Sequence, residues 1–357
     1  MLTKNILIQE DESIKDALKK LDKTATKVLS VVDKKDKLLG TITDGDIRRY
    51  ILKGKSLEGN IRDIYNKKPI FINQDAFSIE EAREMFIKNK IDLIPITDKA
   101  ERVIDFITWD KAFSDGSQGL FNIGKVSVPA VIMAGGKGTR LEPFSNIFPK
   151  ALIPIGEKPI IEIIIDKFRR SGINEYYLTL NYKGKMIESY FDSIEKDYAV
   201  HYVWDSEYSG TAASLKLMEG KICDNFILSN CDVIVEANFE EVLNLHKEQK
   251  ALLTILSSIQ HYKVPYGVIR FKEGGEVTET IEKPEYTFTI NTGVYILNKE
   301  SLRFIPKNSY FDMTDLIKTL IENNKKVITY PVNESEYIDI GHWEEYKKAI
   351  EKLKIIE

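Results

Sequence analysis

The first third of the chain repeats itself, and this repeat limits what the N-terminal part can fold into. In the 357-residue sequence, two segments recur at a constant offset that carries Asp33 onto Asp98. The matching segments are residues 13–21 with 78–86 and residues 28–43 with 93–108. Each copy shows an amphipathic helix, a buried strand, a turn, a second strand and a helix. Two copies are too few for a solenoid, so we expect a pseudo-twofold pair of small βαββα units.

The repeat resembles a tandem pair of CBS domains, a Bateman module. The resemblance covers residues 1–117, with copies at about 1–60 and 66–117. In that family a strand followed by Thr-x-x-Asp lines a cleft for the ribose of an adenosine nucleotide, and the first copy has this motif at Thr43 and Asp46. The resemblance implies that these residues bind a regulatory adenine nucleotide and that the module forms homo-oligomers. Alternatively, Thr43 and Asp46 only cap the helix beginning at Ile47. The second copy has Lys111 in place of the aspartate, so the motif supports a ribose contact in the first copy.

Composition and charge exclude several classes of protein. Hydrophobic residues make up 43% and charged residues 30% of the chain, a mixture typical of globular domains. A formal net charge of −4 indicates no basic footprint for nucleic acid. Two cysteines, Cys223 and Cys231, are too few for a disulfide framework or a four-cysteine zinc site. Because we find no apolar run of about 18 residues and no apolar leader, we expect a cytoplasmic protein without membrane or nucleic-acid partners.

A segment with several serines and glycines predicts a linker at residues 118–127, before a second domain at residues 128–357. The second domain opens with a short apolar run, a predicted buried strand, followed at once by Gly135, Gly136 and Gly138. A glycine loop after a strand brings backbone N–H groups against phosphates. The order of these residues matches neither the P-loop nor the dinucleotide fingerprint, and such a loop can also be a simple tight turn.

Two cations follow the glycine loop. Arg140 can donate two hydrogen bonds to phosphate oxygens, and Lys150, in a segment stiffened by Pro149, adds a compact charge. Together they suit a triphosphate, although each alone could be a solvated surface cation. The segment from Ala134 to Leu141, taken with Phe-Pro-Lys150, resembles the signature of the sugar-1-phosphate nucleotidyltransferases. Within that family the chain is most like glucosamine-1-phosphate or mannose-1-phosphate guanylyltransferases.

The fold class follows from the alternation of predicted strands and helices between residues 128 and 259. This alternation favours a mostly parallel α/β sheet covered by helices on both faces. The resemblance implies the same architecture: a Rossmann-like, mostly parallel nucleotidyltransferase domain, preceded by the smaller α+β CBS module. In such sheets the site lies at the carboxyl ends of the strands, so the glycine loop, Asn181, Asp205 and Asp232 are expected to face one crevice.

A pair of carboxylates is the candidate metal site. Asp232 ends an apolar strand predicted at residues 225–232, and Asp339 lies in an apolar run followed by Gly341. Mg²⁺ is usually held by one or two carboxylates together with substrate phosphates, whereas a lone Asp at a strand end can simply form a turn. The resemblance implies that Asp232 and Asp339 are the Mg²⁺ ligands. Cys231 stands where the family usually has glycine.

The resemblance assigns the remaining site residues. The nucleotide-binding residues would be Ala134, Gly135, Gly136, Gly138, Thr139, Asn181, Gly210 and Thr211. The sugar would be bound by Gly267, Glu282 and Asn291. Lys283 would bind the sugar phosphate and act with Arg140 and Lys150 in catalysis. The family commonly has Thr-Pro where this chain has His342-Trp343, a change expected to reshape the sugar end of the site.

The expected reaction joins a sugar 1-phosphate to the nucleoside monophosphate of an NTP, GTP by preference, with release of pyrophosphate. The sugar would be glucosamine, mannose or heptose 1-phosphate, for surface-glycan or nonulosonic-acid biosynthesis. No general base is required, because the attacking phosphate oxygen is already ionised at neutral pH. Uridylyl, cytidylyl or adenylyl transfer by the same mechanism stays open, as does a non-catalytic, nucleotide-sensing regulatory subunit. An oxidoreductase is excluded by the missing G-x-G-x-x-G motif.

Overall fold

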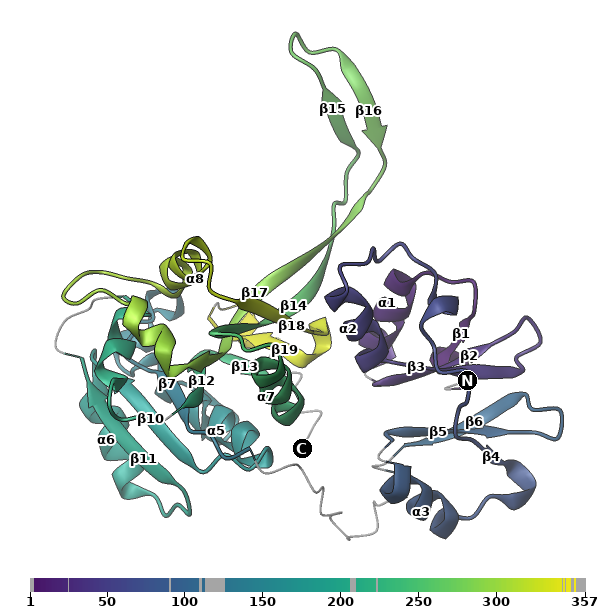
Figure 1. Ribbon diagram of the computed structural model, residues 1–357, viewed down its shortest axis with the longest axis horizontal. Helices are drawn as coiled ribbons and strands as arrows, with labels where there is room; N and C mark the ends of the chain where they lie inside the picture. The colour runs from purple at the N-terminus through teal and green to yellow at the C-terminus, as the bar shows by residue number, and fades with distance from the viewer. Residues whose placement is uncertain are drawn as a thin grey trace. The chain divides into compact units, whose positions relative to one another are not determined.

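The computed structural model of the chain forms two compact units, Met1–Phe121 and Asn122–Glu357 (Figure 1). The residues that it describes are 3–24, 26–89, 91–108, 111–112, 126–205, 210–222, 224–341, 343, 345–347 and 350. Most of the predicted linker, together with Cys223 and His342, lies outside these ranges. Each unit is described by itself.

The first unit consists of two three-stranded sheets with the strand orders β1-β2-β3 and β4-β5-β6. Its elements are β1 (Leu7–Gln9), α1 (Ile14–Thr24), β2 (Val28–Val32), β3 (Leu38–Thr43), α2 (Asp44–Leu52), β4 (Ile72–Asn73), α3 (Ile79–Asn89), β5 (Leu93–Thr97) and β6 (Val103–Thr108). In each sheet the first two strands are parallel and the last two antiparallel. The predicted pair of α+β repeats is therefore confirmed.

The two repeats are related by a pseudo-twofold axis at their hairpin turns. Leu38 N–H of the first repeat donates to Glu101 O of the second at 2.9 Å. The matching residue of the second repeat, Val103, donates its N–H to Asp36 O of the first at 3.0 Å. Asp36 and Glu101, at matching positions, both have a φ of 60°. Asp33 and Asp98 each accept backbone N–H groups within their own turn, and those bonds lower the pKa of both carboxyls. The sequence repeat is thus a repeat of hydrogen bonds as well.

The second unit is built on a seven-stranded sheet with the order β11-β10-β7-β12-β17-β14-β18. Its elements are β7 (Ala130–Met133), β8 (Pro154–Ile155), β9 (Lys158–Pro159), α5 (Ile160–Arg170), β10 (Glu175–Leu180), α6 (Gly184–Ser193), β11 (Ala199–Trp204), β12 (Asn225–Asn230), β13 (Val233–Val235), α7 (Phe239–Glu248), β14 (Leu253–Lys263), β15 (Val268–Phe271), β16 (Val277–Ile281), β17 (Glu285–Asn298), α8 (Met313–Glu322), β18 (Val327–Val332) and β19 (Tyr337–Asp339). In this sheet, β17 pairs antiparallel with both of its neighbours and the other described pairs are parallel. The predicted mostly parallel α/β sheet is confirmed.

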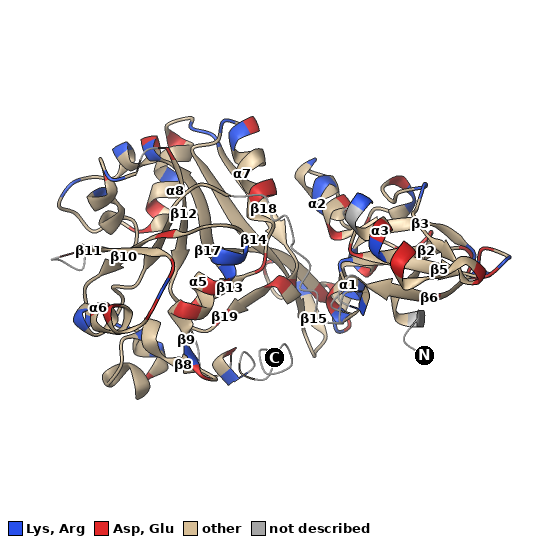
Figure 2. Ribbon diagram, turned by 90° about the horizontal axis from the view of Figure 1, so that it is seen from below, with Lys and Arg blue, Asp and Glu red and all other residues tan. Residues whose placement is uncertain are grey.

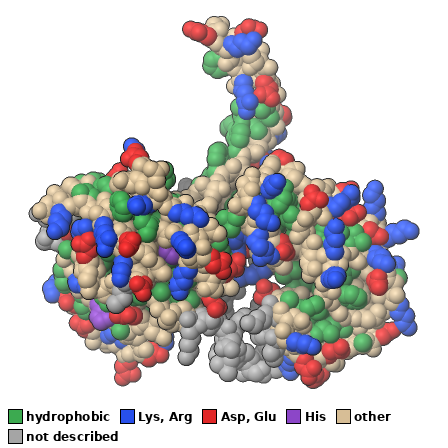
Figure 3. All heavy atoms as spheres, viewed as in Figure 1, with side chains coloured by type: hydrophobic (Ala, Val, Ile, Leu, Met, Phe, Trp, Pro, Cys, Tyr) green, Lys and Arg blue, Asp and Glu red, His purple; other side chains and the backbone are tan. Residues whose placement is uncertain are grey.

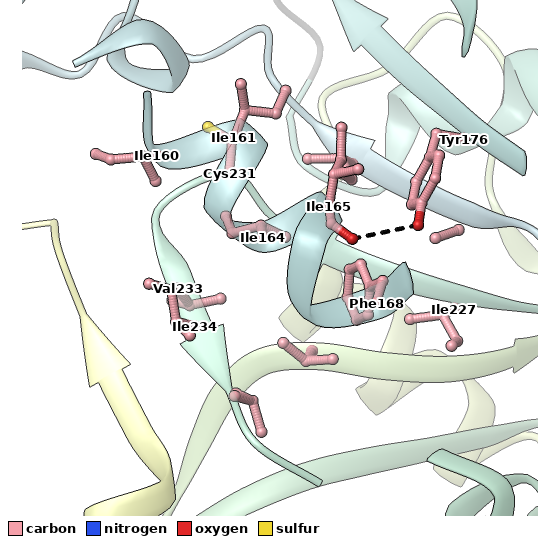
Figure 4. Packing of buried hydrophobic residues seen from close by; sticks show 14 of the residues in the cluster. Ile160, Ile161, Ile164, Ile165, Phe168, Tyr176, Ile227, Cys231, Val233 and Ile234 are labelled. Atoms are coloured by element: carbon pink, nitrogen blue, oxygen red, sulfur yellow. Dashed lines mark hydrogen bonds between the residues drawn. The ribbon is translucent and has the colours of Figure 1, made fainter. Parts of the chain in front are cut away.

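Helix α5 shows how the core of this unit forms. Ile160, Ile161, Ile164, Ile165 and Phe168 recur at helical spacing and are all buried. They pack on strand side chains and on Cys231 and Val233, next to the end of β12 (Figure 4). Full burial of each large apolar side chain contributes about 1.5–3 kcal/mol. Figure 2 shows Lys, Arg, Asp and Glu mostly on helices and loops, whereas the strands of this sheet are largely uncharged.

A two-stranded hairpin projects from this sheet (Figure 1). Strands β14 and β17 stay paired as far as Lys263 and Glu285, whereas β18 pairs with β14 only as far as Ser258. The ribbon therefore leaves its neighbours, and β15 and β16 continue it as an isolated pair. Large apolar side chains are exposed along it (Figure 3). They are Tyr262, Tyr266, Ile269, Phe271, Val277 and Phe288.

Among the helices in the described ranges, none combines the length and the apolar character needed to cross a membrane.

Candidate active site

Two predicted metal ligands meet at the short ribbon formed by β13 and β19. Val233 pairs with Asp339 in this antiparallel ribbon, and Ile340 N–H donates to Asp232 O at 2.8 Å. A Cβ on Gly341 would lie 2.8 Å from Asp339 Oδ1 and 3.0 Å from Asp232 Oδ2. Only glycine permits this close approach, so the two carboxylates lie side by side against its backbone. We call Asp232, Asp339, Gly341 and Lys150 the carboxylate corner.

Lys150 brings a positive charge into the carboxylate corner. Its ammonium forms an ion pair with Asp232 Oδ2, and the two side chains are only 14% and 16% exposed. The negative charges of the corner are also felt by Tyr337, whose pKa is raised first by burial and then by Asp339 and Asp232. Burial likewise raises the pKa of the Cys231 thiol to about 12, so this cysteine is a neutral packing residue under α5.

The glycine loop lies next to the carboxylate corner. It follows β7, and Gly138, with a φ of 68°, leads into a short 3-10 turn at Thr139–Leu141. A Cβ on Gly138 would be 2.9 Å from the Cβ of Lys150, so the loop packs directly on the lysine stem. Arg140, in that turn, is exposed. The structure therefore brings the glycine loop, Lys150 and the two carboxylates together at one end of the sheet.

Asn181 borders the other side of the glycine loop. It follows β10, and a Cβ on Gly135 would lie 3.1 Å from the Asn181 Cβ. The Asn181 side-chain amide donates to Asp205 O at 2.9 Å, which ties together the ends of β10 and β11. Ala134 is buried, whereas Gly136 is exposed and has nothing within 4 Å of its Cβ position. The open face of the loop is thus at Gly136.

The carboxylate corner fits a hard divalent cation. Its donors are carboxylate oxygens, which are the ligands that Mg²⁺ prefers. Asp232 already pairs with one cation, the Lys150 ammonium. Across the described residues, no group of three or more His, Cys, Asp or Glu side chains forms a complete metal cage.

The loop at Gly210 and Thr211 is held by a residue that the sequence analysis did not single out. Asp312 Oδ1 accepts the Thr211 N–H at 2.8 Å and the Thr211 hydroxyl at 3.0 Å. Gly210, with a φ of 99°, leaves no room for a side chain, since its Cβ would lie 2.6 Å from Phe311 O. Burial works to raise the pKa of Asp312, but hydrogen bonds from Thr211 and Tyr310 outweigh it and lower this pKa. Because its N–H is already bound, Thr211 is a loop anchor in this structure.

The residues predicted to bind the sugar do not all join this group. Gly267, Glu282 and Lys283 lie together on the projecting hairpin (Figure 1). Lys283 Nζ is 3.8 Å from Glu282 Oε1, and their side chains are 58% and 72% exposed. No hydrogen bond or ion pair recorded between described residues joins them to the carboxylate corner. The cause is the long pairing of β14 with β17, which carries these residues out of the sheet.

Asn291 remains on the sheet, in β17. Its side-chain amide donates to the Tyr295 hydroxyl at 2.9 Å, and its carbonyl accepts the Gly293 N–H at 3.0 Å. Both ends of the amide are therefore bound within its own strand, which fixes its orientation.

In the first unit, Thr43 and Asp46 form a capping box at the start of α2. Asp46 N–H donates to Thr43 Oγ1 at 3.1 Å, and Thr43 N–H donates to Asp46 Oδ2 at 2.9 Å. Arg49 donates to the other Asp46 oxygen at 2.6 Å. The helix cap considered in the sequence analysis is therefore present, and a ribose would have to share Asp46 with Arg49.

Comparisons with known proteins agree with these two units. The sequence model described as nucleotidyl transferase matches residues 129–355, and the CBS domain model matches residues 1–53 and 61–113. A UTP–glucose-1-phosphate uridylyltransferase from Synechocystis is 29% identical over 243 residues, covering 62% of this chain and 62% of the relative. A mannose-1-phosphate guanyltransferase from Yarrowia lipolytica is 33% identical over 226 residues, covering 60% of this chain and 59% of the relative. The crystal structure of HddC from Yersinia pseudotuberculosis superposes with a TM-score of 0.51 at 27% identity, covering 63% of this chain and 99% of that one. The chain spans about three fifths of the length of these two curated relatives.

Proposed function

Since the chain belongs to the nucleotidyl transferase family, we propose that it transfers a nucleoside monophosphate from an NTP to a sugar 1-phosphate and releases pyrophosphate. The observation that carries this proposal is the carboxylate corner beside the glycine loop. Two carboxylates, one ammonium and a strand-to-glycine turn converge there from segments as far apart as Gly138 and Gly341. Such a site suits the transfer of a phosphoryl-type group between two anionic substrates.

The chemical difficulty of this reaction is the repulsion between the two substrates. Unit charges 4 Å apart interact by about 4 kcal/mol at an effective dielectric constant near 20. Asp232 and Asp339 would hold Mg²⁺, which, when bound, neutralises phosphate charge and orients the phosphates for in-line attack. Lys150 and Arg140 would bind the phosphates that leave as pyrophosphate. The backbone of Gly135 and Gly136 would lie along the triphosphate, where a side chain would obstruct it.

The role proposed for Asn181 follows from its place beside the glycine loop, and the role proposed for Gly210 follows from the family resemblance. Asn181 lies against Gly135, so it would meet the nucleoside end of an NTP whose phosphates lie along the glycine loop. Gly210 and Thr211 would border the base, with Asp312 keeping them in place. Lys283 would bind the sugar phosphate and Glu282 a sugar hydroxyl. For this, the hairpin would have to bend from its extended position toward the bound sugar.

For the base and the sugar we propose GTP and glucosamine, mannose or heptose 1-phosphate. The support is that several of the similar curated proteins are mannose-1-phosphate guanylyltransferases. The Synechocystis relative is a uridylyltransferase, which makes uridylyl transfer the principal alternative. No residue in the described site distinguishes guanine from uracil by itself.

The test is a pyrophosphate-release screen of four NTPs against a panel of sugar 1-phosphates in Mg²⁺. We expect one pair with GTP to give the highest kcat/KM, and we expect chelation with EDTA to abolish it. Highest turnover with UTP would overturn the choice of base while leaving the reaction intact. Absence of turnover with every pair would favour the non-catalytic regulatory subunit.

The CBS unit is the second part of the proposal. We infer that it binds an adenine nucleotide near Thr43 and Asp46 and that its helices form a homo-oligomeric contact, on the strength of the family match. Titration of the full chain with AMP or ATP should give saturable binding that Asp46→Asn weakens about tenfold, because a ribose hydroxyl loses its charged acceptor. Equal binding by the variant would leave Asp46 with its capping role alone.

A further inference from the structure

The turn that connects Arg140 with Lys150 carries large apolar side chains that are partly exposed. It runs from Arg140 to Lys150 and includes a 3-10 turn at Phe144–Asn146. Leu141 and Ser145 are buried, but Phe144 is 41% and Phe148 42% exposed. Backbone turns and the Lys183 ammonium, which donates to Ser145 O at 3.1 Å, hold the middle of this turn, and its exposed rings are open to a contact from another segment.

Trp343 contacts this turn from the far end of the sequence. Its indole N–H donates to Glu142 O at 2.8 Å, a bond between residues 201 positions apart. Its ring lies 5.1 Å from the Phe144 ring, a distance typical of aromatic pairs. On its other side it meets Tyr346 edge-on at 5.6 Å, and the Tyr346 hydroxyl donates to Pro154 O at 2.6 Å. Trp343 thus lies between the rings of Phe144 and Tyr346, and a phenylalanine at position 346 would keep the second of these contacts.

Trp343 is close in sequence to the carboxylate corner, so its contacts link the turn to that corner. It follows Gly341 by two residues, and Gly341 is the glycine against which Asp232 and Asp339 lie. One short segment therefore touches the carboxylates at Gly341 and the turn after Arg140 at Trp343. The Arg140–Lys150 turn is tied to the carboxylates at its Lys150 end by the ion pair with Asp232 and near its Arg140 end by Trp343.

We propose that Trp343 is a positioning residue. It holds the turn at Glu142–Phe144, and this fixes the position of Arg140 relative to the carboxylate corner. This rests on the proposed function, in which Arg140 and Lys150 bind the departing pyrophosphate. Loss of Trp343 leaves each cation in place on its own segment but lets their spacing vary. Misplacement of a charged group by about 1 Å can cost on the order of a hundredfold in rate.

The test compares Trp343→Leu and Trp343→Phe with Tyr346→Phe, a matched control that removes one hydrogen bond to a backbone carbonyl from the same C-terminal segment. The probe is inorganic pyrophosphate with Mg²⁺, titrated by calorimetry. We expect Trp343→Leu to weaken pyrophosphate binding about tenfold and to lower kcat more than the KM of the sugar phosphate. Trp343→Phe keeps a ring but not the N–H and should fall between, whereas Tyr346→Phe should stay within about twofold of the parent.

Hydrogen exchange of the full chain provides a readout that does not depend on activity. Amides of residues 141–149 should exchange about tenfold faster in Trp343→Leu, with those of α5 unchanged. If Trp343→Leu does not fold, Trp343→Phe carries the same comparison. Parent-like pyrophosphate binding and exchange in the Trp343 variants would overturn the proposal. If the parent itself binds no pyrophosphate, the proposed function is at fault, and exchange at residues 141–149 alone decides the role of Trp343.

Discussion

The carboxylate corner and the projecting hairpin carry residues predicted for the same reaction, yet they are built in opposite ways. At the corner, Asp232 is 16% exposed and is fixed by strand pairing and an ion pair. On the hairpin, Lys283 is 58% exposed and its recorded ion-pair partner is its neighbour in sequence, Glu282. Two-stranded ribbons are marginal in water without a covering layer. The residues proposed to bind metal and phosphate are thus positioned by the sheet, whereas those proposed to bind the sugar lie on an exposed ribbon outside it.

The largest expected effect is at the corner. Asp232→Asn should lower turnover by at least ~10³-fold, because the cation and the in-line geometry both depend on this carboxylate. Steady-state rates of pyrophosphate release in Mg²⁺ measure it. Glu276→Gln, which removes an exposed carboxylate near the tip of the hairpin, is the matched control and should stay near the parent rate. An active Asp232→Asn with an unchanged melting temperature would refute the metal role.

Gly341→Ala tests whether close packing matters at the corner. The new methyl carbon would lie 2.8 Å from Asp339 Oδ1 and 3.0 Å from Asp232 Oδ2, so the carboxylates must separate. We expect activity to fall by about 10–100-fold and the Mg²⁺ requirement to rise. Gly274→Ala serves for contrast: its φ of 91° makes alanine strained there, but nothing lies within 4 Å of its Cβ position and the hairpin tip is away from the corner, so activity should change little. Equal effects of the two substitutions would show that close packing against the carboxylates is not what makes position 341 sensitive.

Lys283→Ala sharpens the comparison on the hairpin side. If the hairpin meets the sugar phosphate, loss of this charge should raise the KM of the sugar 1-phosphate about 10–100-fold and leave the KM of the NTP unchanged. Arg270→Ala is the matched variant, since Arg270 is also on the hairpin and pairs with Glu279 at 3.2 Å. Parent-like kinetics for Lys283→Ala would show that this lysine of the hairpin does not bind the sugar phosphate.

A smaller effect is expected at the nucleotide loop. Asp312→Ala removes the acceptor for both the N–H and the hydroxyl of Thr211, so the KM of the NTP should rise about tenfold. Asp312→Asn keeps an acceptor oxygen and should lie closer to the parent. An unchanged KM in Asp312→Ala would mean that the loop holds its shape without this contact.

The last effect concerns the stability of the fold and not activity, and it lies outside both regions. His246 is buried, its Nδ1 is 2.7 Å from Thr254 Oγ1, and burial lowers its pKa to about 4. Below pH 6.5 the unfolded chain takes up a proton that the folded chain resists until about pH 4. Stability should therefore fall by up to ~3 kcal/mol as the pH drops through this window. Urea unfolding of His246→Gln should show a weaker pH dependence; an identical slope would contradict the assignment.

The sequence predicted the parts of the molecule that local pattern determines. The offset repeat predicted two equivalent units, and the alternation of apolar runs predicted the central sheet. The helix cap at Thr43 and Asp46 could also be predicted, because the Thr-x-x-Asp spacing that forms it is local. Helix α5 (Ile160–Arg170) belongs to that alternation, since its buried residues recur at helical spacing.

What escaped the sequence analysis depends on contacts between distant segments. The strand expected at residues 225–232 ends at Asn230, and a second short strand, β13, pairs with β19 to orient Asp232. Asp312 meets Thr211 across 101 positions, and its only local signal was that of a helix cap. The direction of the hairpin depends on where the neighbouring strands stop, which no local pattern records. Strand registers of this kind, and not residue types, decide which predicted ligands meet.

The central claim is that Asp232 and Asp339 share one divalent cation beside the glycine loop. Anomalous diffraction from crystals of the full chain grown with Mn²⁺ and a non-hydrolysable GTP analogue tests it most directly. We predict one anomalous Mn²⁺ peak within about 2.2 Å of an oxygen from each carboxylate, with the triphosphate along Gly135 and Gly136. A Mn²⁺ ion held by the triphosphate with neither carboxylate as a ligand would contradict it.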